Sequence, residues 1–233
     1  KRDGTSWTEQ AKLTASDAEH LAPHAYFGWS VSIDGDYAIV GSRADGKGSA
    51  YVFSRSDTTW SQQQKLIPDD AAAGDYYFGQ SVSIEGDYAI IGGPYTIFGS
   101  ESGSAYIFKR SGITWSQQTK LTATDAAAGD SFGYSVSISG DNAIVGAQHN
   151  DDDGGDSGSA YIFTRSDTTW TQEQKLTASD AAAEGFFGVS VSISGEDAIV
   201  GAVSPYNVVG EPSGSAYVYT DLTPTPLIEV SPA

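Results

Sequence analysis

The sequence contains no cysteine and no methionine, and it is poor in basic residues. Without cysteine the chain has neither disulfide bonds nor thiolate metal sites. Only 12 lysines and arginines stand against 30 aspartates and glutamates, which gives a net charge of −18. Nucleic acid and anionic membrane surfaces are therefore disfavoured as partners, since both require a basic surface. No apolar run approaches the ~18 residues of a membrane-spanning helix, so we expect no membrane insertion.

Helical periodicity is missing too, because the Asp-Ala-Ala-Ala segments are short and lie close to glycine. The chain instead repeats one unit four times, over residues 26–42, 77–93, 131–147 and 186–202. Each copy starts with an aromatic or serine residue, then Phe-Gly, and alternates through Ser-Val-Ser-Ile. It turns at glycine beside an acidic residue and continues as an apolar run. This pattern predicts two strands joined by a tight hairpin.

The repeat length indicates the architecture. Four tryptophans recur every 53 to 55 residues, at Trp7, Trp60, Trp115 and Trp170. A period of this length with four strands per repeat is typical of propeller blades. In the second repeat, strands A to D are expected at residues 78–85, 88–92, 104–110 and 114–122. The sequence therefore predicts an all-β fold, a β-propeller of four four-stranded blades, with Trp60, Trp115 and Trp170 packed between neighbouring blades.

The ends of the pattern predict how the ring closes. Residues 6–14 resemble a strand D with no preceding A to C, whereas residues 187–220 hold A to C with no following D. We expect the N-terminal strand to complete the last blade and so remove the exposed edges. The alternative is part of a larger propeller, because residues 1–4 resemble the end of a strand C. Residues 1–220 are assigned to the propeller, and residues 221–233 to a stiff Pro/Thr linker toward a following domain.

The Phe-Gly opening, the Ser-Val centre and the closing Val-Gly resemble FG-GAP repeats, the blades of the integrin α-subunit propeller. The sequence Lys-Leu-Thr-Ala-(Ser/Thr)-Asp ahead of Phe-Gly is more similar to the bacterial variant of secreted and surface proteins. The resemblance covers residues 5–220. It implies a propeller that serves adhesion or protein binding outside the cell, so we expect an extracellular or cell-surface location.

Calcium sites of that family cannot be transferred to this chain. The A–B turns, such as Asp34-Gly35-Asp36, are too short to surround a cation that takes ~6–8 oxygen ligands. One acidic B–C loop remains a candidate metal site, through Asp151, Asp153 and Asp156. The alternative is a solvated surface loop. We therefore expect that no cofactor is required and that any calcium binding is weak.

Candidate ligand-binding residues lie where the repeats differ, since variation among loops on a common scaffold indicates function. Two of them follow Phe-Gly on strand A, near the central channel: Trp29 and Tyr134. The others lie in B–C loops: Tyr95, Phe98, Tyr206 and Asn207. Exposed aromatic residues beside amides suit sugar or peptide ligands. The alternative is that these side chains pack on their own blades.

A recurring aspartate in the D–A loops, at Asp17, Asp70, Asp125 and Asp180, is expected to fix local turns, with an axial ion site as the alternative. No serine lies in a nucleophile-elbow motif. We therefore predict a non-catalytic extracellular module that binds carbohydrate or protein at the cell surface. The alternatives are a structural spacer or self-assembling unit of a large surface protein, and an enzyme that acts on polysaccharides.

Overall fold

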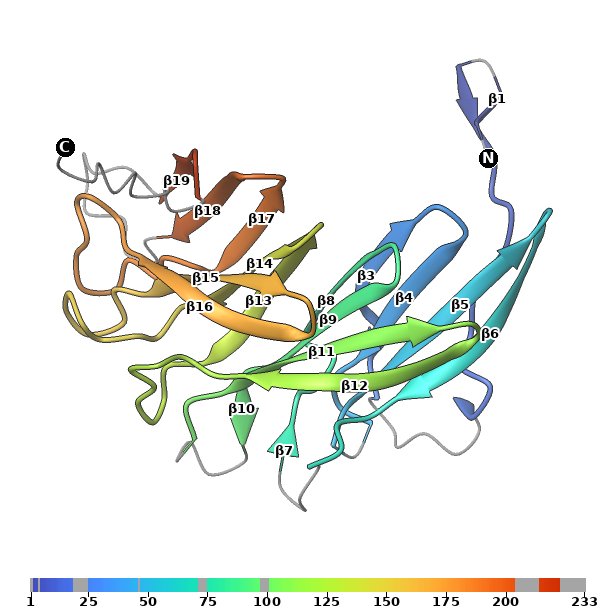
Figure 1. Cartoon of the computed structure of the whole chain (residues 1–233), viewed down its shortest axis with the longest axis horizontal. Coiled ribbons are helices and arrows are strands. Elements are labelled where there is room, and N and C mark those ends of the chain that lie inside the picture. Colours follow the sequence, from blue (N-terminus) through green and yellow to red (C-terminus); the bar gives the residue numbers. More distant parts are fainter. Residues whose placement is uncertain are drawn as a thin grey trace, which may run out of the picture.

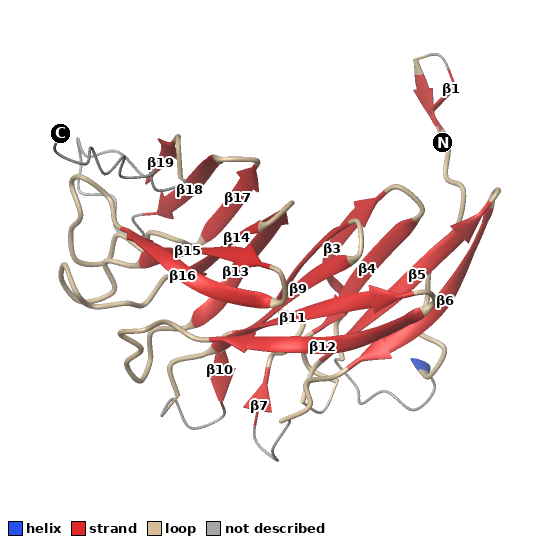
Figure 2. Ribbon diagram, viewed as in Figure 1, coloured by secondary structure: helices blue, strands red, loops and turns tan. Residues whose placement is uncertain are grey.

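The computed structural model describes residues 2–3, 5–18, 25–45, 47–70, 75–96, 101–203 and 214–222. For residues 2–3, 75–76 and 95–96 it describes the backbone alone. Within these ranges, no helix is long and apolar enough to cross a membrane. The predicted all-β propeller of four blades is confirmed: antiparallel sheets stand side by side in an arc (Figure 1), and helix is almost absent (Figure 2).

Each blade is one antiparallel sheet whose strands follow chain order from the inside outward. The first blade consists of β3 (Phe27–Asp34), β4 (Tyr37–Ser42), β5 (Ser49–Ser56) and β6 (Thr59–Leu66). The second consists of β8 (Ser81–Glu85), β9 (Tyr88–Gly93), β11 (Ser104–Ser111) and β12 (Thr114–Leu121). The third consists of β13 (Phe132–Ser139), β14 (Asn142–Ala147), β15 (Ser159–Ser166) and β16 (Thr169–Leu176). The fourth holds three described strands, β17 (Ser190–Ser194), β18 (Asp197–Val203) and β19 (Gly214–Tyr219).

Within the described ranges, two short strand pairs lie outside the blades. The N-terminal pair joins β1 (Arg2–Asp3) to β2 (Ser6–Trp7). The other joins β7 (Asp75–Tyr76) to β10 (Tyr95–Thr96).

Neighbouring blades pack through apolar faces that the strand alternation creates. Between the first two blades, Ile39 and Val52 lie in one buried cluster with Val82 and Ile84 of the next blade. The corresponding clusters recur between the second and third blades and between the third and fourth. Trp115 is 2% exposed in the cluster between the first and second blades, so its predicted place between blades is confirmed. Trp60 and Trp170 are partly buried against equivalent clusters.

A glycine in strand B lets the blades approach each other. A Cβ on Gly92 would lie 1.9 Å from the carbonyl oxygen of Gly133, which follows Phe132 in the next blade. The same clash would arise at Gly41 with Gly79 and at Gly146 with Gly188. The Phe-Gly turn of one blade thus fits against the Val-Gly segment of the preceding blade, which explains why both dipeptides recur.

The predicted closure of the ring by the N-terminal strand is wrong. Residues 6–7 pair with residues 2–3, and Trp7 is 80% exposed. Among the described strands, β19 pairs with β18 alone. The physical reason is that the first blade, on which Leu13 and Ala15 pack, and the fourth blade with β19 lie at opposite ends of the arc (Figure 1). The segment is therefore tied too far away to reach the fourth blade.

Leu222, inside the predicted Pro/Thr linker, contacts the last two blades. Leu222 is buried in the cluster between the third and fourth blades, and its N–H donates to the Glu196 carbonyl. Residues 223–233 of the predicted linker lie outside the described residues, and the boundary at residue 221 stays a prediction.

Candidate functional site

Two faces of the blades differ in chemistry. The A–B and C–D turns form one face, on which an arginine pairs with a turn aspartate in three blades: Arg55–Asp36, Arg110–Asp87 and Arg165–Asp141. These arginines also lie over aromatic rings; Arg110, for example, is 4.1 Å from the Tyr37 ring of the preceding blade. The repetition identifies this face as scaffold. The B–C and D–A loops form the other, variable face, which is called the loop face below.

An aromatic cluster with an arginine at its centre lies on the loop face between the first two blades. The Arg43 guanidinium lies 3.4 Å from the Trp29 ring, 5.4 Å from Tyr26 and 5.1 Å from Tyr77. Its Nη1 donates to Gln80 Oε1 at 2.9 Å. Trp29 and Tyr26 meet edge to face and remain 47% and 48% exposed. The cluster therefore offers a cation and open aromatic surface to solvent.

The backbone before Phe-Gly orients this cluster. Tyr26 and Tyr77 have positive φ angles of 55° and 78°, in the left-handed region that costs a side chain energy. Ser131 and Phe186 occupy the same conformation in the other two blades. The strained turn is therefore a property of every blade, and the chemistry of the cluster depends on which side chains stand there.

The recurring aspartates of the D–A loops pair with lysines of the following repeat. Lys65 lies 2.7 Å from Asp17, and its counterparts form the pairs Lys120–Asp70 (2.6 Å) and Lys175–Asp125 (2.7 Å). These contacts tie each loop to the next blade, so the predicted local role in turns is incomplete. Asp180 accepts a hydrogen bond from Tyr217 Oη at 2.6 Å.

The first of these pairs carries an additional carboxylate. Lys65 also lies 2.5 Å from Asp45, and Tyr51 Oη donates to Asp17 at 3.0 Å. Burial alone would raise the pKa of Asp17, but hydrogen bonds from Lys65 and Tyr51 outweigh it and lower the pKa below its usual 3.8. Burial raises the pKa of Tyr51 to about 12. Burial opposes the charge of Lys65, yet its hydrogen bonds to both carboxylates raise its pKa. The lysine therefore stays protonated.

An open pocket of about 400 Å³ adjoins this network. It is lined by Asp45, Lys47, Gly48, Ser49, Lys65 and Ile67. Its volume lies within the ~300–1,000 Å³ of ligand sites, and its lining combines charges with one apolar side chain. Asp45 and Arg43 belong to the same short B–C loop. The loop thus contributes to both the pocket and the aromatic cluster.

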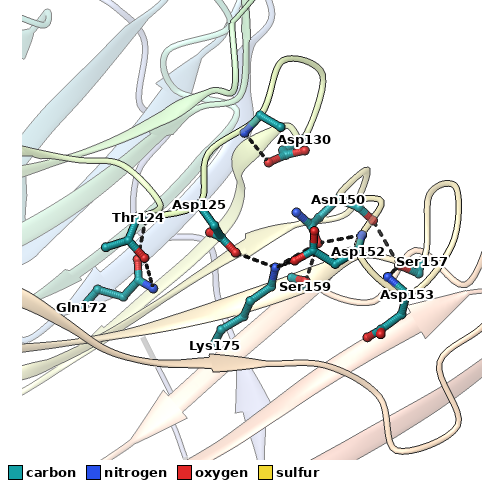
Figure 3. A network of polar contacts seen from close by, with 11 residues as sticks. Thr124, Asp125, Asp130, Asn150, Asp152, Asp153, Ser157, Ser159, Gln172 and Lys175 are labelled. Atoms are coloured by element: carbon teal, nitrogen blue, oxygen red, sulfur yellow. Dashed lines mark hydrogen bonds and ion pairs between the residues drawn. The ribbon is translucent and has the colours of Figure 1, made fainter.

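Several carboxylates of the acidic B–C loop are engaged in contacts within the protein, and Figure 3 shows Asp152 and Asn150 of this loop beside Lys175. Asp152 pairs with Lys175, and buried Asn150 accepts from Ser159 Oγ at 2.8 Å. Asp151 accepts the N–H of Asp156, whose own carboxylate contacts His149 Nδ1, both at 2.7 Å. In the described parts of the chain, no three acidic, histidine or cysteine side chains form a group suited to a metal ion. Weak calcium binding through Asp151, Asp153 and Asp156 stays a prediction.

Of the predicted ligand-binding residues, the structure describes the side chains of Trp29 and Tyr134, which lie apart. Trp29 belongs to the aromatic cluster, whereas Tyr134 is half-buried at the equivalent position two blades away. Tyr95 is described by its backbone, which pairs with Tyr76. Phe98, Tyr206 and Asn207 lie outside the described residues. The sequence analysis did not identify Arg43 as the centre of the cluster. The available signal was that Trp29 and Arg43 each occupy a position where the other three repeats have a different residue.

Four segments of the chain match the FG-GAP repeat family, at residues 7–53, 60–108, 115–163 and 170–219. The matched segments correspond to the four repeats, and the first begins at Trp7. No curated protein matches the sequence.

Proposed function

The chain belongs to the FG-GAP repeat family, and from that premise we propose that it is a non-catalytic binding module of an extracellular or cell-surface protein. FG-GAP propellers are often binding or adhesion modules. The ligand that suits the loop face best is a carbohydrate, with a protein as the second candidate. The observation that carries this proposal is the cluster of Trp29, Tyr26 and Arg43.

The chemistry of the cluster supports a sugar ligand. Aromatic rings provide apolar surface for the C–H faces of a sugar, and an arginine donates several hydrogen bonds to hydroxyl or carboxylate groups. The adjoining pocket adds Asp45 and Lys47 as further charged groups. A net charge of −18 favours a neutral glycan over a strongly acidic one.

The distribution of carboxylates favours binding over catalysis. A glycosidase of the usual kind needs two inequivalent carboxyl groups at a defined separation. On the loop face, Asp17, Asp70 and Asp125 are equivalent by repetition, and each pairs with a lysine. We therefore propose that the chain does not cleave polysaccharide, and turnover of a polysaccharide panel would contradict this.

The proposal is tested by a glycan array followed by titration calorimetry with the best glycan. Trp29→Ala should weaken binding by about 30-fold or more, because an aromatic anchor contributes about 2 kcal/mol. The control is Trp7→Ala, which removes the same type of side chain from the N-terminal hairpin, away from the cluster, and should leave affinity unchanged. Thermal melting of both variants verifies folding.

Two results would count against the proposal. If the array yields no glycan ligand, the carbohydrate assignment is wrong and a protein ligand takes its place. If a glycan binds Trp29→Ala and the parent chain equally, the ligand site lies elsewhere than the aromatic cluster.

A further inference from the structure

The first blade exposes an apolar face that the other blades bury. On β3, Val31 and Ile33 are 68% and 65% exposed. Their counterparts on β8 and β13 are only 4–6% exposed: Val82, Ile84, Val136 and Ile138. The sequence is the same Ser-Val-Ser-Ile in each blade, so the difference arises from the neighbour. The second and third blades have a preceding blade, and the first has none among the described residues.

The fourth blade exposes the opposite face. Ile199 on β18 and Val218 on β19 are 44% and 69% exposed. The equivalent side chains in the first three blades are fully buried: Ile39, Val52, Ile90, Ile107, Ile144 and Ile162. Exposed faces of this kind on a folded protein mark interaction sites.

The two open faces are the two halves of one interface. In each blade-to-blade junction, the Ile/Val pair of strands B and C packs on the Val/Ile pair of the next strand A. The fourth blade ends with the first half of this junction, and the first blade begins with the second half. The three junctions in the structure therefore show that each open face is complementary to the other one.

Polar groups at the two faces match in the same way. Ser32 Oγ accepts the N–H of Ile84 at 3.2 Å, and Ser137 Oγ accepts the N–H of Ile193 at 3.2 Å. At the open ends, Ser192 is the equivalent acceptor and the Ile33 N–H is the equivalent donor. A hydrogen bond between these two groups would fix the position of one face on the other.

The N-terminal segment is already placed as a connection from a preceding blade. Trp60 Nε1 donates to Gln10, as Trp115 donates to Gln63 and Trp170 to Gln118. The N–H of Ser16 donates to Gln62, which matches the contacts of the second and third repeats. Residues 10–17 thus occupy the position of the segment that connects a strand D to the next blade.

We propose that copies of this chain associate head to tail. Residues 8–13 of one copy add to β19 of a second copy as its fourth strand, and the first blade of the former stacks on the fourth blade of the latter. Interior registers, such as Tyr161 opposite Lys175, place Lys12 opposite Tyr217. Lys12 then lies near Asp180 and supplies the lysine that Asp17, Asp70 and Asp125 already have.

A second copy fits these faces better than the chain's own opposite end. The first and fourth blades lie at opposite ends of the arc (Figure 1), so the two halves do not meet within one chain. An interface made of two different surfaces is heterologous, and it produces rings or filaments as copies are added. This association is independent of the glycan proposal, because it uses the blade faces and not the loop face.

The test is sedimentation of the full chain from micromolar to millimolar concentration. We expect the average mass to rise with concentration. Val31→Glu on the first blade and Val218→Lys on the fourth should each weaken association at least about tenfold, because a charge would be buried in the junction. Both side chains are exposed in the single chain, so both variants should keep its melting temperature. Ile113→Glu, a 78% exposed position on a C–D turn, is the matched control and should associate normally.

A mixture of the two variants distinguishes the head-to-tail arrangement. The Val31→Glu copy keeps its fourth blade and the Val218→Lys copy keeps its first blade, so the mixture should form one-to-one dimers that neither variant forms alone. A monomer at every concentration would overturn the proposal, whether or not Trp7 becomes shielded by closure within one chain. Association that persists in both variants, or a mixture that stays monomeric, would overturn it as well.

Discussion

The middle of the molecule and its two ends are built from the same sequence and differ in what they bury. Trp115 is 2% exposed between two blades, whereas Trp7, at the same place in the repeat, is 80% exposed. The same holds for Val82 at 6% against Val31 at 68%. The contrast teaches that a residue of this motif is a core residue only when the neighbouring blade is present. Stability should then be a sum over blades and junctions, as in other repeat proteins.

Replacing the repeated tryptophan by alanine is expected to give the largest difference in stability loss between the middle of the molecule and its end. Trp115→Ala should lower the free energy of unfolding by ~3–5 kcal/mol, the usual cost of removing a large aromatic from a core. Trp7→Ala should change it by less than about 0.5 kcal/mol, as for an exposed surface residue. Urea denaturation of both variants measures the comparison. Equal costs for the two would mean that burial in the junction does not stabilise the fold.

Filling the strand-B glycine should give the next largest difference. Gly92→Ala places a methyl group 1.9 Å from the Gly133 carbonyl oxygen, and the junction must open to accept it. A cost of about 1–3 kcal/mol is expected from overpacking. In Gly201→Ala the nearest atom is Ser190 Oγ of the same blade, at 2.6 Å, which a rotation of the serine relieves. Gly201→Ala should therefore melt closer to the parent chain, and a reversed order would contradict the backbone fit between blades.

The inter-repeat ion pair should give the smallest effect, and a dependence on pH reveals it. Burial alone would raise the pKa of Asp125, but the hydrogen bond and charge of Lys175 outweigh it and hold the pKa below 3.8. The carboxylate therefore stabilises the fold above pH ~4, and this contribution is lost as the pH falls through the lowered pKa. Because Asp125 is 38% exposed, we expect no more than about 1 kcal/mol.

Asp125→Asn should accordingly lose stability at pH 7 and almost none at pH 2. Asp180→Asn is the matched end variant, since no lysine pairs with Asp180 among the described residues. Unfolding in urea at the two pH values measures both. A loss at pH 7 from Asp180→Asn as large as that from Asp125→Asn would show that the lysine contributes nothing.

The strands of each blade could be predicted from the sequence because their signals are local. The Phe-Gly opening, the alternation and the glycine turn recur four times, and strand D was expected at residues 114–122 where β12 spans Thr114–Leu121. Closure could not be predicted in this way. It depends on the rotation accumulated over several blades, and no single repeat encodes that rotation.

The candidate site was harder to predict because its members come from different repeats. Trp29 and Arg43 lie on the first blade, but Tyr77 and Gln80 belong to the second, and only the packing of blades brings them together. The pairing of Lys65 with Asp17 was also missed. A signal for it was present, since lysine and aspartate recur with the same period.

The lysine–aspartate pairs join a strand D of one repeat to the loop that ends the preceding repeat, and this has a mechanical consequence. A chain pulled from its C-terminus loads the fourth blade first, whose outer described strand, β19, pairs with β18 as its only strand neighbour among the described residues. Peeling β19 breaks hydrogen bonds one after another. Further unfolding requires tension on the third blade. Its strand β16 is bonded through Lys175 and Gln172 to the loop that connects the second and third blades. Resistance to pulling should therefore rise stepwise from the last blade inward, so that the molecule yields at its edge before it loses its middle.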